Sequence, residues 1–294
     1  MKLEKIEYID RKTKKVLVEN VPGEGFLKFL YHNPFGKLPL ELLVKRKFLS
    51  SFYGKIMDKK NSVEKIEDFV KNNHIDMSES AKSIEEFTSF NDFFYRKLKP
   101  NVRKIEDGVV SPADGKIIGF ESVGHWDRFF VKGSEFSLEK YLNDKELFEK
   151  YKGGSMVVVR LAPADYHRYH FPLSGKVGVR NQINGYYYSV SPYAIKDNFG
   201  YFCENKRELT TLKTEKYGDV IISEIGATMV GGIEQTYTPN STVTKGEEKG
   251  YFTFGGSSVM LLFEKGKVKI DSDILENTKN GYETKIYMGE KIGE

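Results

Sequence analysis

Cysteine and long apolar runs are nearly absent from this chain of 294 residues. Its single cysteine, Cys203, excludes an intrachain disulfide and a metal cage built from cysteines, and it fits a reducing compartment. No window approaches the roughly 18 continuous apolar residues that span a bilayer. The first residues also lack the apolar stretch of a signal peptide. We therefore expect a cytosol-facing protein without a membrane-spanning helix.

Net charge is also small, at +4, and the balance of 30% charged and 39% hydrophobic residues is that of a folded globular protein. The basic residues are unevenly spread, however. Residues 26–60 contain eight basic and two acidic side chains, and an anionic partner responds to that local field. The stretch from Phe26 to Tyr53 combines apolar residues with a basic excess, which suits an interfacial helix on anionic lipid. An ordinary amphipathic helix packed on the core is the alternative.

The residue pattern of the sequence changes near residue 105. Before it, residues 3–18 read as a hairpin, and the pattern becomes helical from Phe26 to about Lys99. Further helices are expected over 63–72 and 83–98, the last opened by a Ser83-x-x-Glu86 capping box. After it, short β-branched runs alternate with glycine-rich turns. The sequence therefore predicts an α+β protein, with a mainly helical N-terminal region, residues 1–105, and a β-rich, mostly antiparallel domain, residues 106–294. The similar segments 111–118 and 172–179 hint at an internal duplication.

Three motifs could carry chemistry. The first is Gly255-Gly256-Ser257-Ser258, within a strand-like stretch that the glycines weaken. A β-bulge or tight corner would explain it. Alternatively, the backbone bends there so that the Ser257 hydroxyl can reach the carbonyl carbon of Gly256, an attack that residues without side chains permit.

The second motif contains two of the five histidines, His167 and His170, three residues apart. Buried structural histidines are one explanation, and a metal pair would need a third ligand that is not nearby, so we expect no metal. Histidine can also take and give a proton near neutrality. The third motif is Ser111-Pro-Ala-Asp114-Gly115, where the aspartate either forms a turn or orients a histidine. Together these motifs could supply a carboxylate that orients a histidine (Asp114), a base (His170) and a hydroxyl (Ser257).

The three motifs together resemble the phosphatidylserine decarboxylase family, which pairs an Asp-Gly turn, a His-x-x-His segment and a Gly-Ser self-cleavage site before an apolar strand. The segments 91–100 and 226–231 resemble further parts of that family, so the resemblance covers roughly residues 20–270, in order. Ser258 and Gly255 differ from many members, but Gly256-Ser257 is intact.

This resemblance implies a lyase that prepares its own cofactor. His170, oriented by Asp114, would activate Ser257. Cleavage between Gly256 and Ser257 would leave a β chain, residues 1–256, and an α chain, residues 257–294, that stay associated. Ser257 would become a covalent pyruvoyl group, pyruvate being the cofactor, which acts as an electron sink. By the same resemblance, His167 would serve decarboxylation of phosphatidylserine to phosphatidylethanolamine and carbon dioxide.

The implied partner is phosphatidylserine in an anionic membrane, bound peripherally at the cytoplasmic face of the cell membrane. We expect no nucleic-acid partner and leave open a homodimer. Three other functions fit parts of the pattern. A pyruvoyl decarboxylase for a soluble amino acid would not need the basic N-terminal region. A carrier-type β domain would leave the chain uncut, and a Ser-His-Asp hydrolase lacks its usual Gly-x-Ser-x-Gly motif.

Overall fold

The structure is a computed structural model, and it describes residues 5–19, 21, 25, 29, 54–124, 127–128, 135–227, 232–255 and 257–294. Except for Phe29, the expected interfacial helix over 26–53 lies outside these residues. So do Gly256 and the stretch 228–231. Among the described residues, no helix is both long enough and apolar enough to cross a membrane.

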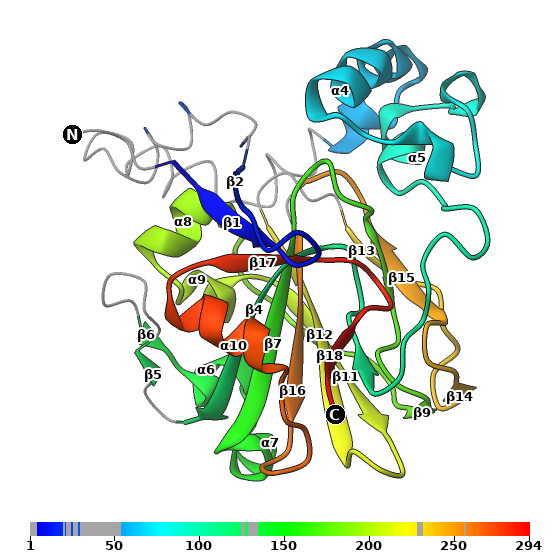
Figure 1. The fold of residues 1–294 in the computed structure, drawn as a ribbon. Coiled ribbons are helices and arrows are strands. Elements are labelled where there is room, and N and C mark those ends of the chain that lie inside the picture. Colours follow the sequence, from blue (N-terminus) through cyan, green and yellow to red (C-terminus); the bar gives the residue numbers. More distant parts are fainter. Residues whose placement is uncertain are drawn as a thin grey trace.

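One large sheet organises the molecule (Figure 1). Its pairs are antiparallel except for one, in which β1 runs parallel to β17. In spatial order its strands are β14 (Thr242–Val243), β9 (Gly175–Val177), β11 (Arg207–Lys213), β12 (Asp219–Gly226), β16 (Ser257–Phe263), β7 (Gly154–Leu161), β4 (Gly115–Val123), β17 (Glu283–Ile286), β1 (Glu7–Asp10) and β2 (Val16–Val18), with β10 (Asn181–Ile183) also paired to β11.

Strand β16 lies inside this sheet, and every one of its residues is buried. Such a strand has apolar side chains on both faces and therefore reads as a continuous apolar run. Val259, Leu261 and Phe263 point into one core. Met260 and Leu262 point into the other. The alternation places Ser257 on the same face as Val259.

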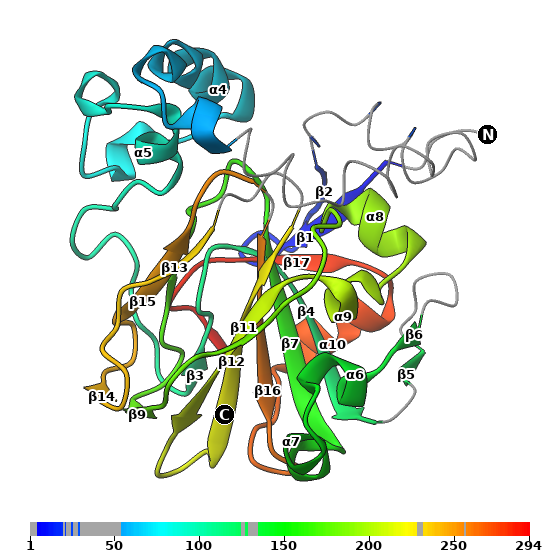
Figure 2. The same ribbon diagram turned by 180° about the vertical axis from the view of Figure 1, so that it is seen from behind.

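Short elements cover the two faces (Figures 1 and 2). Helices α6 (Leu138–Leu142), α7 (Lys145–Tyr151) and α9 (Tyr201–Glu204) pack on one face. On the other lie α10 (Ser272–Lys279) and a small sheet of β13 (Ile233–Gln235), β15 (Glu248–Phe252) and β8 (Arg168–His170). The remaining elements are α8 (Pro192–Asp197), the pair β3 (Val109–Val110) and β18 (Lys291–Gly293), and the pair β5 (Asp127–Arg128) and β6 (Glu135–Phe136).

The N-terminal part contains a separate small helical lobe (Figure 1). It comprises η2 (Lys60–Lys65), α4 (Ile66–Asn73), η3 (Met77–Glu79), η4 (Ile84–Glu86) and α5 (Phe90–Phe94). Its core is a cluster of phenylalanines with Met57 and Ile66, against which Phe254 also packs. The lobe therefore contacts the chain just before β16.

The helix expected over 83–98 is broken, which corrects the sequence prediction. The capping box of Ser83 and Glu86 is present, but it opens only the 3-10 turn η4. The side chain of Ser89 then accepts a hydrogen bond from Asp92 N and caps a new helix, α5. The helix expected over 63–72 is confirmed as η2 followed by α4. The predicted α+β class, helical first and then mostly antiparallel, is also confirmed.

The N-terminal hairpin belongs to the large sheet rather than to the helical lobe. Strands β1 and β2 form the hairpin predicted for residues 3–18, and β1 pairs with β17 near the other end of the chain. The last helix of the lobe ends at Phe94 and the next strand begins at Val109, whereas the hairpin precedes the lobe in sequence and joins the large sheet in space.

Two glycines occupy equivalent places on either side of the sheet centre. A Cβ at Gly115 in β4 would lie 2.4 Å from the carbonyl oxygen of Arg160 in β7, and one at Gly175 in β9 would lie 2.3 Å from that of Lys213 in β11. The order β9-β11-β12 on one side mirrors β4-β7-β16 on the other. This symmetry supports the internal duplication that the two segments indicated.

Candidate active site

Ser257 is the first residue of β16 and has no exposed surface. It pairs with Gly226 of β12 on one side and with Leu161 of β7 on the other. Two residues earlier, Gly255 has a φ of 140°, in the region that favours glycine. The chain bends at Phe254 and Gly255, and the Ser257 hydroxyl occupies a buried position at the start of the strand.

The Ser257 hydroxyl faces His167. The distance from Ser257 Oγ to His167 Nδ1 is 3.2 Å, and the other ring nitrogen, Nε2, lies 3.0 Å from the carbonyl oxygen of Ala162. A carbonyl only accepts, so Nε2 carries the hydrogen and donates it. The Nδ1 lone pair is then free to accept from the hydroxyl. This tautomer is the one in which His167 can act as a base towards Ser257.

The surroundings of His167 keep it neutral. Burial lowers its pKa to about 3, although the Asp165 carboxylate acts in the opposite direction. The ring of Phe94, from α5, stacks on the imidazole with their centroids 3.8 Å apart. The helical lobe thus forms an apolar cover over the histidine and excludes water from it.

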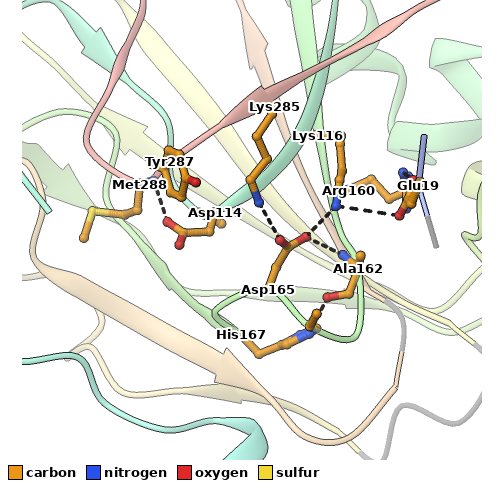
Figure 3. Close-up of polar contacts among 12 residues, drawn as sticks. Glu19, Asp114, Lys116, Arg160, Ala162, Asp165, His167, Lys285, Tyr287 and Met288 are labelled. Atoms are coloured by element: carbon orange, nitrogen blue, oxygen red, sulfur yellow. Dashed lines mark hydrogen bonds and ion pairs between the residues drawn. The ribbon is translucent and has the colours of Figure 1, made fainter. Parts of the chain in front are cut away.

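Asp165 holds the loop that carries His167 (Figure 3). Its carboxylate accepts a hydrogen bond of 2.8 Å from Ala162 N, and it forms ion pairs of 3.3 Å with Lys116 and 2.7 Å with Lys285. Burial alone would raise the pKa of Asp165, but the two lysines and the backbone N–H hold it well below its usual range. The ionised carboxylate therefore closes the turn from Ala162 to Asp165, and that turn positions the acceptor of the His167 ring.

His170 and Asp114 lie side by side but are not joined through their side chains. His170 N donates a 2.7 Å hydrogen bond to the carbonyl of Pro112, which brings the Asp-Gly turn against β8. The Nδ1 atom of His170 is buried and has no hydrogen-bond partner among the described residues. Burial lowers the pKa of His170 to about 4, while Glu248 and Asp114 act in the opposite direction.

The expected hydrogen-bonded relay from Asp114 through His170 to Ser257 therefore differs from the arrangement seen. The carboxylate of Asp114 accepts from Met288 N at 2.8 Å and pairs with Arg103 at 2.7 Å. In the described part of the chain, the Ser257 hydroxyl contacts His167 and not His170. Because the guanidinium and the backbone N–H occupy Asp114, it acts on His170 through its charge alone.

The role of α5 as a support of the site was not predicted from the sequence. Asn91 is buried, and its Oδ1 accepts a 2.8 Å hydrogen bond from the backbone N–H of Phe254. Its amide donates in turn to Asp58 at 2.7 Å. Asn91 therefore fixes the chain two residues before Gly256. The segment 91–100 stood out only by resemblance, and no local pattern indicated this contact.

Within the described ranges, no group of three or more histidine, cysteine, aspartate or glutamate side chains could hold a metal ion. A buried hydroxyl that follows two glycines, faces a neutral imidazole and begins a central strand is suited to attack on the preceding carbonyl.

Comparisons with known proteins point to one family. A sequence model of the family described as phosphatidylserine decarboxylase matches residues 90–294. A phosphatidylserine decarboxylase proenzyme of Fusobacterium nucleatum subsp. nucleatum is 62% identical over 296 residues, covering 100% of this chain and 99% of that protein. Proteins of the same name from Clostridium tetani and Chlamydia caviae are 50% and 48% identical, each across at least 98% of both chains. The chain therefore belongs to the phosphatidylserine decarboxylase family.

Proposed function

We propose that this protein decarboxylates phosphatidylserine to phosphatidylethanolamine, using a pyruvoyl group that it makes from Ser257. The observation that carries the proposal is the Ser257 hydroxyl, which is buried at the start of the central strand β16 and hydrogen-bonded to His167. The names of the relatives, as proenzymes of this activity, support both the substrate and self-processing.

The residues around Ser257 fit a pyruvoyl group at this position. Such a group is smaller than serine with its preceding peptide bond, and β16 holds it by pairs with both neighbouring strands. His167 Nδ1 lies within hydrogen-bond reach of the side chain that would become the methyl group. When formed, the ketone supplies the electron sink that loss of carbon dioxide from an α-amino acid requires.

Maturation, in our proposal, proceeds through the chain's own groups. Ser257 Oγ attacks the carbonyl carbon of Gly256, the peptide C–N bond breaks, and an ester and a free amine result. Removal of the Ser257 Cα proton then expels the Gly256 carboxylate from Cβ. The remaining enamine rearranges to an imine, which water hydrolyses to the ketone and ammonia. The products are chains 1–256 and 257–294.

We assign the proton transfers of maturation to His170 with Asp114. A base that removes a proton must become an imidazolium, and nearby carboxylates stabilise that ion. Against the dominant effect of burial, the charges of Glu248 and Asp114 favour protonation of His170. The step requires the Ser257 hydroxyl to leave its hydrogen bond to His167. That requirement makes the assignment testable.

We assign His167 to turnover. Its ring is held by Ala162 and covered by Phe94, so Nδ1 stays directed at residue 257. A buried neutral imidazole at that point can hold and return a proton at the substrate carbon after carbon dioxide leaves. The apolar cover also keeps water from competing for the same position.

Peripheral association with a membrane is part of the proposed function. Residues 106–294 would form the catalytic domain and residues 1–105 the region that associates peripherally with the cytoplasmic face of an anionic membrane. The basic excess over residues 26–60 supports this. So do the apolar side chains of Val16 and Val18 in the edge strand β2, which are 51% and 54% exposed.

Intact mass of the purified protein tests the proposal. We expect two chains, the smaller with 294 − 256 = 38 residues and lighter by one ammonia than the same peptide beginning with serine. Ser257→Ala should give one uncut, inactive chain because no hydroxyl can attack Gly256. Active wild-type protein in a single uncut chain would refute the proposal. Release of carbon dioxide from free serine but not from phosphatidylserine vesicles would indicate a soluble amino acid as substrate instead.

A further inference from the structure

Arg96 is a buried cation that forms no ion pair with any described residue, although the charges of Asp114 and Asp165 act on it from a longer distance. Only 7% of its surface is exposed, yet its one hydrogen bond to a described residue is a 3.4 Å contact from Nη2 to the carbonyl of Ala164. Its guanidinium also lies 5.0 Å from the centre of the Phe93 ring. Throughout the described ranges, no carboxylate forms an ion pair with it. Burying a charge is costly unless hydrogen bonds or an opposite charge compensate.

Other buried or half-buried arginines among the described residues are compensated. Arg103 and Arg160 each pair with two carboxylates, and Arg168 pairs with one. Arg207 has no ion pair in the described structure, but it donates to four different backbone carbonyls. Arg96 has five donors and makes one long hydrogen bond to a described residue, while none of its nitrogens is both fully buried and unpaired in the described structure, so the guanidinium stays open to a ligand. The difference indicates that this guanidinium is arranged for an anion that binds from outside the chain.

The position of Arg96 is at the active site. It follows α5, two residues after Phe94, whose ring covers His167. The carbonyl that it contacts belongs to Ala164, in the turn that positions the His167 ring.

The proposed substrate brings two anions to this place, its carboxylate and its phosphodiester. In phosphatidylserine only Cβ and one oxygen separate the phosphorus from the reacting carbon, so a group that binds the phosphodiester must lie beside the site. An ion pair with the carboxylate would stabilise the ground state and be lost as carbon dioxide leaves, which slows the reaction. The phosphodiester keeps its charge throughout, and the planar fork of arginine matches its oxygens.

We propose that Arg96 binds the phosphodiester of the lipid headgroup and so anchors the substrate next to His167 and residue 257. This inference rests on the proposed function. It assigns a binding role and no proton transfer, so the loss should appear mainly in KM.

The test compares Arg96→Gln and Arg96→Lys with the wild type on two water-soluble substrates, glycerophosphoserine and O-methylserine. O-methylserine has the same amine and carboxylate as glycerophosphoserine and also has an oxygen on Cβ, but it has no phosphate. Lys97→Gln is the matched control, since it removes a charge from the neighbouring, exposed position. Conversion is followed as carbon dioxide released per pyruvoyl group.

We expect all variants to be cut into two chains. With glycerophosphoserine, Arg96→Gln should lower kcat/KM by about 10- to 100-fold, as expected for loss of a charge-assisted contact, and Arg96→Lys should lose less. With O-methylserine both should match the wild type, as should Lys97→Gln with either substrate. Binding of glycerophosphoethanolamine, measured by calorimetry, should weaken in Arg96→Gln by a similar factor.

Equal losses with both substrates would overturn the inference, because Arg96 would then bind the carboxylate or support the fold. Failure of both Arg96 variants to be cut would also overturn it, by assigning the residue to maturation or stability. An inactive, uncut wild type would instead refute the proposed function itself. The two failures are therefore distinguishable.

Discussion

Replacing His167 by alanine should separate the two roles that we assign to the histidines. His167→Ala should still be cut between Gly256 and Ser257 and still contain a pyruvoyl group, yet decarboxylate slowly. His170→Ala should remain largely uncut, and Asp114→Asn should be cut slowly, because it removes the charge that favours protonated His170. The His167 ring contacts the Ser257 hydroxyl, so a base role of His167 in cleavage would give the opposite result.

The expected size of the effect follows from the contacts of His167. Loss of a general acid–base group costs about 10²- to 10⁴-fold in rate. The substitution also removes the partners of Ser257 Oγ and the Ala162 carbonyl, at about 1–3 kcal/mol for each group left unpaired. Loss of the Phe94 stack adds about 0.5–1.5 kcal/mol. A folded but less stable protein is expected, because domains have about 5–15 kcal/mol of stability.

The assay must therefore separate catalysis from folding. His167→Asn is the matched variant, because its Oδ1 can replace Nδ1 as the acceptor for Ser257 but cannot titrate. Cleavage is read by mass, pyruvoyl content by a carbonyl reagent and the rate per pyruvoyl group by release of carbon dioxide. If both His167 variants stay uncut, the hydrogen bond from Ser257 to His167 is the base contact of maturation and our division of roles is refuted. Normal turnover in both would make His167 structural.

Two further predictions concern contacts that hold the site together. Asn91→Ala should slow cleavage in a time course on gels, because Phe254 N–H loses its acceptor; cleavage at the wild-type rate would contradict this. Lys285→Met should lower Tm at pH 7 by removing an ion pair to Asp165. The pKa of Asp165 is depressed in the fold by its lysines despite burial, so its contribution is present above the ordinary value of about 4 and is lost as pH falls below it. Scans of Tm against pH should therefore show a smaller acid-induced loss in Lys285→Met than in the wild type, and equal losses would contradict the reasoning.

Features that depend on neighbouring residues could be predicted from the sequence. The hairpin that became β1 and β2 and the capping box of Ser83 and Glu86 are local patterns, and the structure contains both. The apolar run after Ser257 likewise predicted a buried strand. The error over 83–98 was also local, since Ser89 competes with the helix as a new cap and the capping box gave no length.

Features that depend on distant residues could not be predicted. The contact between Asn91 and Phe254 joins positions 163 residues apart, and nothing near either residue indicates it. The same holds for the partner of the Ser257 hydroxyl. His167 and His170 are the same type of side chain and lie in one motif, so the sequence does not distinguish them. Only the path of the loop held by Asp165 decides which ring faces β16.

The position of β16 also bears on how a self-processing protein can refold. The segment 257–294 contributes this central strand, paired over seven residues on each side, as well as β17, α10 and β18. Before the proposed cut, the sheet assembles within one chain, and loop closure limits its entropy cost. After the cut, the same sheet is a complex of two molecules, so its unfolding is a dissociation and its midpoint depends on protein concentration. Peptide-bond cleavage would thus turn a unimolecular folding reaction into a bimolecular one.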